Sequence, residues 1–114
     1  GMRTKPNPLC LIFIRPTQGP VSTASTTEFW RSETVRKSTE PEFTRKLVLP
    51  HTFRETDLTI TFKFYDVETG KSELVNEIGY AETTIRQIFS KETVSDLLKV
   101  KWSVRIARVF LHEF

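Results

Sequence analysis

The feature that most constrains the fold is a strict alternation of apolar and polar residues between positions 58 and 65. Ile60, Phe62 and Phe64 fall on one side of this alternation, and the residues between them, Thr59, Thr61 and Lys63, fall on the other. Successive side chains point to opposite faces of a β-strand, so the pattern predicts a strand with one buried face. A polar loop follows, and a second strand-like run begins near Ile78.

The rest of the chain has the same two-residue period, with one exception. Residues 84–99 place Ile85, Ile88 and Phe89 at helical spacing, which predicts a short helix or a single turn of one. The expected strands are 9–14, 29–37, 43–49, 58–65, 78–84 and 101–111. This pattern predicts an all-β fold, an antiparallel β-sandwich with about seven strands and one short helix.

Length and charge set the broad class. The 114 residues correspond to one domain, 1–114, which can bury a core without disulfides. No apolar run approaches the roughly 18 residues of a membrane span. The single cysteine, Cys10, cannot form an internal disulfide, so we expect a cytoplasmic protein. A net charge of +3 is compatible with anionic partners without requiring them.

The residues that carry catalysis or metal chemistry form no recognisable constellation. His51 and His112 are far apart and match no zinc spacing. Cys10 lies in an apolar run, which favours a buried structural thiol. The four glycines form no phosphate-binding loop, and no nucleophile elbow is present. We therefore expect no enzyme activity, and the exposed aromatics lack the interleaving of a nucleic-acid stacking platform.

The loop after residue 65 raises the question of metal binding. It holds five oxygen-bearing side chains: Asp66, Glu68, Glu73, Asn76 and Glu77. Ca²⁺ binds six to eight oxygen ligands, several of them carboxylates. From the residues alone, the segment is either a calcium loop or a polar hairpin.

Several segments together resemble a C2 domain, most closely the C2 domains of copines. They are "RSETVRKSTEPEFTRKLVL", "LTITFKFYDVET" and "EIGYAETTIRQIFS", with "KPNPLCLIF" upstream and "KWSVRIARVF" downstream. The resemblance covers residues 5–110. It implies an eight-stranded antiparallel sandwich whose loops at one end bind calcium and then phospholipid.

The sequence departs from this family in its calcium loops. Asn7 stands where the family has an aspartate, Asp66 keeps one ligand position, Glu68 replaces another aspartate, and Asn76 aligns with a third. The family's first strand and first calcium loop should precede residue 5, where only "GMRT" stands. We therefore expect vestigial calcium positions at Asn7, Asp66, Glu68 and Asn76, no required cofactor, and at most weak calcium binding.

Basic residues suggest a second kind of site. The candidate lipid-binding residues are Arg31, Arg36, Lys37, Arg45 and Lys46. The resemblance places them on strands that carry a basic concave patch in many C2 domains. Each basic group near an anionic leaflet contributes about 1 kcal/mol. The opposing interpretation is that Glu33, Glu40 and Glu42 cancel this field.

Three functional hypotheses remain at this stage. In the first, the chain is a calcium-independent module that contacts anionic phospholipid peripherally at a membrane. In the second, it is a protein-interaction module with degenerate calcium loops. The third is a calcium-dependent lipid binder whose first loop comes from elsewhere. The absent first strand also predicts an open sheet edge, which the long C-terminal run 99–114, a partner protein or a second subunit can cover. A homodimer paired through strands or edges is the expectation.

Overall fold

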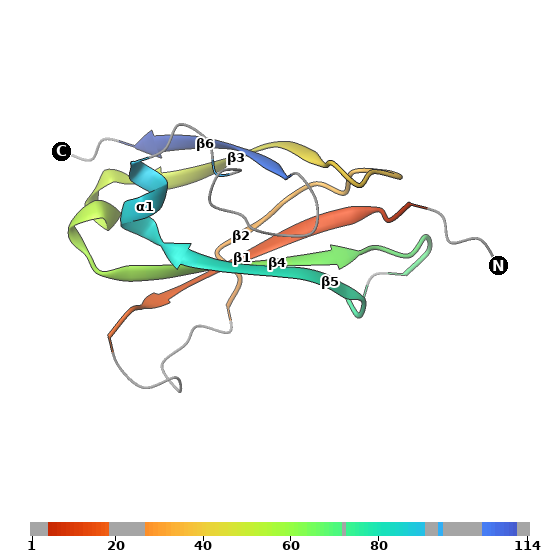
Figure 1. Ribbon diagram of the computed structural model, residues 1–114, viewed down its shortest axis with the longest axis horizontal. Helices are drawn as coiled ribbons and strands as arrows, with labels where there is room; N and C mark the ends of the chain where they lie inside the picture. Colours follow the sequence, from red (N-terminus) through yellow and green to blue (C-terminus); the bar gives the residue numbers. More distant parts are fainter. Residues whose placement is uncertain (1–4, 19–26, 72, 91–93, 95–103, 112–114) are drawn as a thin grey trace.

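The computed structural model describes residues 5–18, 27–71, 73–90, 94 and 104–111. Two layers of β-structure face each other, and two short helical segments lie at one end of the layers (Figure 1). The prediction of an all-β, sandwich-like fold with one short α-helix is confirmed. The elements are β1 (Pro8–Pro16), β2 (Trp30–Arg31), β3 (Glu42–Pro50), the 3-10 helix η2 (His51–Glu55), β4 (Leu58–Asp66), β5 (Glu77–Thr84), α1 (Ile85–Phe89) and β6 (Arg105–Leu111).

The larger sheet is antiparallel throughout and has the strand order β2-β1-β4-β5. Strands β1 and β4 pair along their whole lengths, from Pro8 opposite Asp66 to Pro16 opposite Leu58. Strand β5 returns along β4 as a hairpin. This register places the N-terminal end of β1 beside the loop between β4 and β5, which is the end of the sandwich where the predicted calcium positions meet.

The smaller sheet differs from the antiparallel expectation because β3 and β6 run parallel. Parallel neighbours need a long crossover connection, and roughly 55 residues separate β3 from β6, so the chain can supply one. A register shift between Phe43 and Leu47 places a bulge in the middle of β3. Strand β6 therefore pairs within its own chain, whereas residues 101–103 of the predicted last strand lie outside the described residues.

The core lies between the two sheets. Ile60, Phe62 and Phe64 of β4 are all buried, and they meet Phe43 and Ile106 from the smaller sheet within one hydrophobic cluster. The alternation in β4 thus predicted the buried face correctly. Thr59 and Thr61, on the other face, are also buried, and their hydroxyls form hydrogen bonds with Thr17 and Glu82.

Strand β2 is shorter than the strand predicted over 29–37, and its hydrogen bonds explain why. The N–H groups of residues 29, 32, 35 and 38 donate to the carbonyls of residues 12, 10, 8 and 6. Successive donors on this segment are three residues apart, whereas their acceptors on β1 are two residues apart. This mismatch repeatedly bulges the segment away from regular pairing, so only Trp30–Arg31 forms a strand.

The predicted helix is present but short. Thr84 caps α1 by accepting a hydrogen bond from the Gln87 N–H at 3.3 Å, and the helix ends at Phe89. Residues 91–93 and 95–99 of the predicted segment lie outside the described part of the chain. Among the described residues, no helix is long and apolar enough to span a membrane.

Candidate functional site

The four predicted calcium positions meet at one end of the sandwich, but hydrogen bonds join them to one another. The Asn7 N–H donates to Asp66 Oδ1 at 2.9 Å, and the Asp66 N–H donates to the Asn76 carbonyl at 2.9 Å. The Asn76 side-chain amide in turn donates to Glu68 Oε1 at 3.0 Å. The sequence therefore identified a true cluster, in which amide N–H groups contact the oxygen atoms that a calcium ion would need.

Asn7 is the centre of this network because it joins three segments of the chain. Its side-chain amide donates to the Val67 carbonyl at 3.2 Å, and its Oδ1 accepts the Lys37 N–H at 2.9 Å. The Val67 N–H donates back to the Asn7 carbonyl at 2.9 Å. Lys37 has a left-handed φ of 48°, which a residue with a side chain rarely adopts, and its N–H donates to Asn7 Oδ1 in this conformation.

Glu68 is neutralised by a side chain of the same loop. Its carboxylate contacts Lys71 Nζ at 2.9 Å, and hydrogen bonds from Lys71 and Asn76 lower the pKa of Glu68 below its usual value. The loop closes on a turn at Gly70, which has a φ of +81°. Within the described residues, no group of three or more His, Cys, Asp or Glu side chains is placed to hold a metal ion. The loop connects β4 to β5, and whether it binds calcium stays a question for experiment.

We predict that calcium binds no more tightly than millimolar. A tight site needs several carboxylates around one point, and Asp66 and Glu68 already accept hydrogen bonds from amide or ammonium groups. Calorimetric titration with calcium measures this directly. A micromolar isotherm that disappears in Asp66→Ala would contradict the prediction.

We predict that Asn7→Ala lowers the free energy of unfolding by about 1 to 3 kcal/mol, because two hydrogen bonds of a half-buried side chain are lost. Urea unfolding measures the change. Asn76→Ala is the control: that residue is exposed and its amide makes one bond to Glu68, so we expect a smaller loss. Equal losses in the two variants would show that Asn7 does not join the three segments.

The five predicted lipid-binding residues divide into two groups. Arg31 lies on β2, whereas Arg45 and Lys46 lie at the bulge of β3, and these three form the strand group. Arg45 Nη1 donates to the Arg31 carbonyl at 2.7 Å, so the two sheets approach each other here. Arg36 and Lys37 form the loop group, which lies in the connection between β2 and β3. The two groups are separate on the surface, because a nearly extended chain covers about 16 Å over the five residues from Arg31 to Arg36.

Carboxylates offset the positive charge of the strand group. Glu28 binds Arg31 through two contacts at 3.0 and 2.7 Å, and the Arg31 hydrogen bond lowers the pKa of Glu28. Partial burial pushes the pKa of Glu33 upward, but hydrogen bonds from Thr44 and the Arg45 N–H outweigh it and lower that pKa. The opposing interpretation of the sequence named Glu33 among the residues that cancel basic charge. Glu28 was missed, although its spacing of three from Arg31 in "EFWR" was the available signal.

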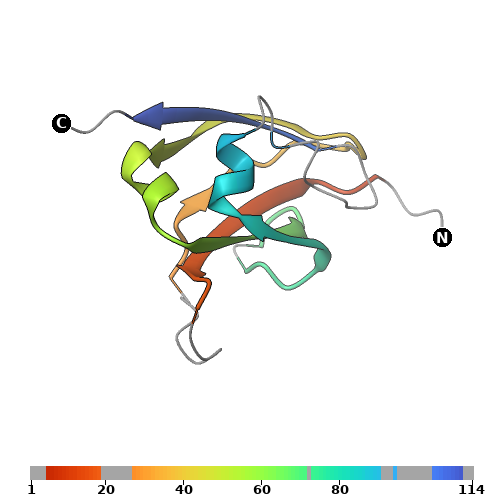
Figure 2. The same cartoon turned by 60° about the vertical axis from the view of Figure 1, so that its left-hand side comes forward.

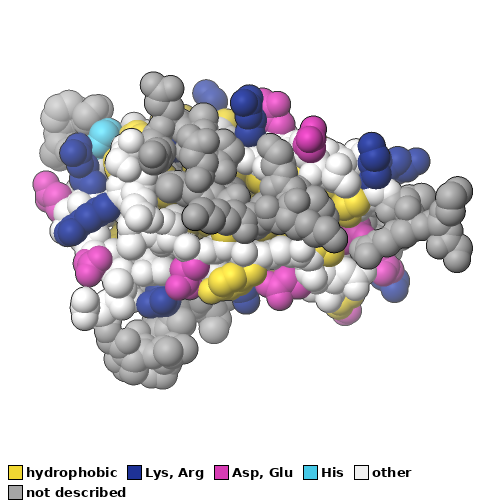
Figure 3. Space-filling model, viewed as in Figure 1, with side chains coloured by type: hydrophobic (Ala, Val, Ile, Leu, Met, Phe, Trp, Pro, Cys, Tyr) yellow, Lys and Arg dark blue, Asp and Glu magenta, His cyan; other side chains and the backbone are white. Residues whose placement is uncertain are grey.

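Arg36 of the loop group borders a hollow of about 310 Å³ at the calcium-position end of the sandwich, which Glu68 also lines. Arg36 and Lys71 line it from opposite segments, together with Thr34 and Thr69. In the part of the chain that the structure describes, the Arg36 guanidinium has no hydrogen bond or ion pair. Figure 3 shows Lys and Arg side chains at both ends of the molecule. The loop group therefore presents positive charge that remains available to a ligand.

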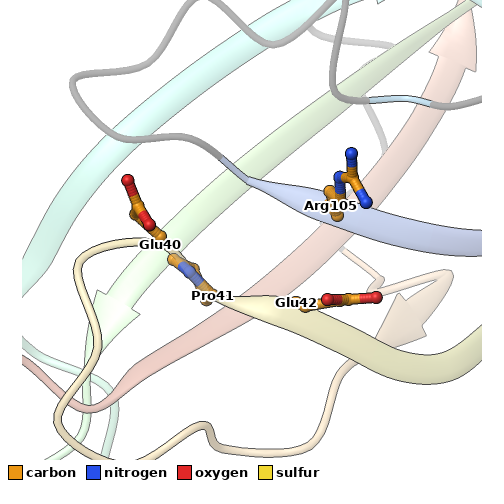
Figure 4. Close-up of a pocket in the computed structure, with 4 residues that line it drawn as sticks. All are labelled: Glu40, Pro41, Glu42 and Arg105. Carbon is orange, nitrogen blue, oxygen red and sulfur yellow. The ribbon is translucent and has the colours of Figure 1, made fainter.

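A further hollow, of about 260 Å³, lies where β3 and β6 begin to pair. Glu40, Glu42 and Arg105 line it, and the Arg105 N–H donates to the Pro41 carbonyl at 3.1 Å. Figure 4 shows the Glu40 and Glu42 carboxylates pointing in different directions rather than toward one point. This arrangement brings no pair of carboxylates together around a ligand.

The structure describes two of the three remaining residues singled out in the sequence, Cys10 and His51. Cys10 is fully buried, and burial raises the pKa of its thiol well above the usual value, so the prediction of a structural thiol is confirmed. His51 was expected to be an ordinary surface residue, but its ring packs 5.8 Å from both Phe89 and Phe110. His112 lies outside the described residues.

No protein-family model matches the chain, and no solved structure matches it.

Proposed function

We propose that the chain is a calcium-independent binding module of the C2-like kind that contacts anionic phospholipid surfaces through its loop group. Arg36 and Lys37 supply the positive charge; Arg36 lines the hollow, whereas Lys71 on its far side is paired with Glu68. The protein then associates peripherally with a membrane from the cytoplasm. The strand group of Arg31, Arg45 and Lys46 contributes less, because Glu28 and Glu33 offset its charge.

The single observation that carries this proposal is the hydrogen-bonded network around Asn7. In a calcium-dependent lipid binder, a bound ion supplies positive charge at the loop tips. Here the oxygen atoms of Asn7, Asp66 and Glu68 already contact protein donors: the Lys37 N–H, the Asn7 N–H and the Lys71 ammonium, respectively. The positive charge at this end belongs to basic side chains of the protein itself. Fixed cations attract an anionic surface without a metal, and salt weakens that attraction.

Vesicle cosedimentation tests the proposal. The protein is mixed with phosphatidylcholine vesicles with and without phosphatidylserine, in a calcium chelator, at low and high salt. We expect pelleting only with phosphatidylserine, at low salt, and to the same extent when calcium replaces the chelator. Pelleting that requires calcium, or no pelleting under any of these conditions, overturns the proposal.

A protein-interaction module is the second candidate, and the smaller sheet supplies the observation that favours it. Val48 and Leu111 are large apolar residues that are 40% and 46% exposed, and they lie on neighbouring strands of a sheet with two described strands. An exposed apolar face beside open strand edges suits a second copy of the chain. Light scattering after size-exclusion chromatography distinguishes a homodimer from a monomer at micromolar concentration, and a stable monomer removes this homodimer.

A further inference from the structure

The end of the sandwich opposite the loop group carries a stack of basic and aromatic side chains. The Phe89 and Phe110 rings lie parallel with centroids 4.2 Å apart. The Arg54 guanidinium lies 6.0 Å from the Phe89 centroid, and the Arg108 guanidinium lies 4.9 Å from the Phe110 centroid. We call these four residues the cationic aromatic stack. Cation–π contacts of this length orient a guanidinium without neutralising its charge.

A hollow of about 260 Å³ lies beside this stack, between η2 and α1. Arg54 lines it from η2, whereas Arg86, Phe89 and Ser90 line it from α1 and the residue that follows. Figures 1 and 2 both show η2 and α1 side by side at one end of the sheets, with the loop between β4 and β5 at the other. The length of β4 separates the two ends by about 26 Å.

Within the described part of the chain, no carboxylate is paired with the basic side chains that line this hollow. Among the described residues, neither the Arg54 nor the Arg86 side chain makes a hydrogen bond or an ion pair. Arg31, by contrast, is held by Glu28, and Arg108 donates to the Ile88 carbonyl. Two guanidinium groups therefore border one hollow, and no anion among the described residues is bound to them.

We propose that this hollow binds the phosphate group of a phosphate monoester. Such a group carries a charge of about −1.5 to −2 at pH 7, which two guanidinium groups match, whereas a carboxylate carries half as much. The planar N–H fork of each guanidinium fits two phosphate oxygens. The Ser90 hydroxyl already donates to the Gln87 carbonyl at 2.7 Å, so the two arginines supply the donors and the Phe89 ring forms an apolar wall.

This site is independent of the proposed function. The phosphatidylserine headgroup contains a phosphodiester and is assigned to Arg36 and Lys37, at the far end of β4. A loss of binding at one end can thus be measured while the other end is intact.

The test is a titration with glycerol 3-phosphate, followed by amide NMR shifts at Arg54, Arg86 and Ser90. We expect saturable shifts, and at least tenfold weaker binding in Arg54→Gln/Arg86→Gln. The matched control is Arg36→Gln/Lys37→Gln, which removes the same charge at the other end and should bind as the parent does. An absence of shifts, an equal loss in the control, or equal binding of acetate overturns the proposal.

Vesicles distinguish the two sources of a phosphate monoester. Phosphatidic acid carries one in its headgroup and phosphatidylserine does not. If the arginine variant loses binding to both glycerol 3-phosphate and phosphatidic acid vesicles, the site accepts a lipid headgroup. If the variant loses the soluble ligand but sediments with phosphatidic acid vesicles as the parent does, the ligand is a soluble phosphate ester. Either result supports the site.

Discussion

Replacing Arg36 and Lys37 together with glutamate should abolish sedimentation with phosphatidylserine vesicles while the fold is retained. Removing two basic groups costs about 2 kcal/mol of membrane attraction, and adding two acidic groups costs a similar amount again. The total of about 4 kcal/mol corresponds to roughly 1,000-fold weaker binding. Arg36 and Lys37 are both exposed, and Asn7 contacts the Lys37 backbone rather than its side chain, so substitution leaves the network around Asn7 in place.

The control for that experiment carries the same change of charge at the other end of the molecule. Arg54→Glu/Arg86→Glu should sediment with phosphatidylserine vesicles nearly as the parent does, and circular dichroism melting checks that both variants fold. If both double variants lose sedimentation equally, overall charge rather than the loop group governs binding. If neither does, the loop group is not the membrane contact.

Replacing Trp30 with alanine should lower the free energy of unfolding by about 3 to 5 kcal/mol. Trp30 is buried on β2 of the larger sheet, and its indole N–H donates to the Lys46 carbonyl of the smaller sheet at 3.0 Å. The side chain therefore joins the two layers by packing and by a hydrogen bond. Small domains are stable by only about 5 to 15 kcal/mol, so this variant should approach the unfolding threshold.

Two further variants separate the contributions of Trp30. Trp30→Phe keeps most of the buried ring but leaves the Lys46 carbonyl without its donor, and we expect a loss of about 1 to 2 kcal/mol. Phe29→Ala removes the adjacent aromatic, which is 41% exposed and packs on Phe53, and should cost less than Trp30→Ala. Urea unfolding followed by circular dichroism measures all three. Equal losses for Phe29→Ala and Trp30→Ala would refute a special role for the buried ring.

The fold was predictable wherever side chains alternate within one strand. Ile60, Phe62 and Phe64 mark the buried face of β4 because that pattern is local to the strand. The segment 29–37 failed as a strand prediction because its pairing depends on the spacing of carbonyls in β1, which the segment itself does not encode. The parallel pairing of β6 with β3 was missed for a similar reason, since both strands alternate in the same way in either direction.

The candidate site was predictable in its residues but not in its chemistry. Asn7, Asp66, Glu68 and Asn76 do lie together. Their donors include the Lys37 backbone N–H, and no side-chain pattern reveals where a backbone N–H points. The stack of Phe89 on Phe110 was not foreseen, because those residues are distant in sequence and meet only through the packing of α1 against β6.

The parallel pairing of β3 and β6 also has a consequence for the order of folding. Each rung of this sheet joins residues roughly 60 positions apart, so forming it requires closing a long loop, which slows a folding reaction. The antiparallel pair of β4 and β5 closes a short hairpin and can form first. During synthesis, β6 leaves the ribosome after every other described strand. We therefore expect the smaller sheet to assemble last, with the edge of β3 vacant for that interval and exposed to chaperones or to premature association with another nascent chain.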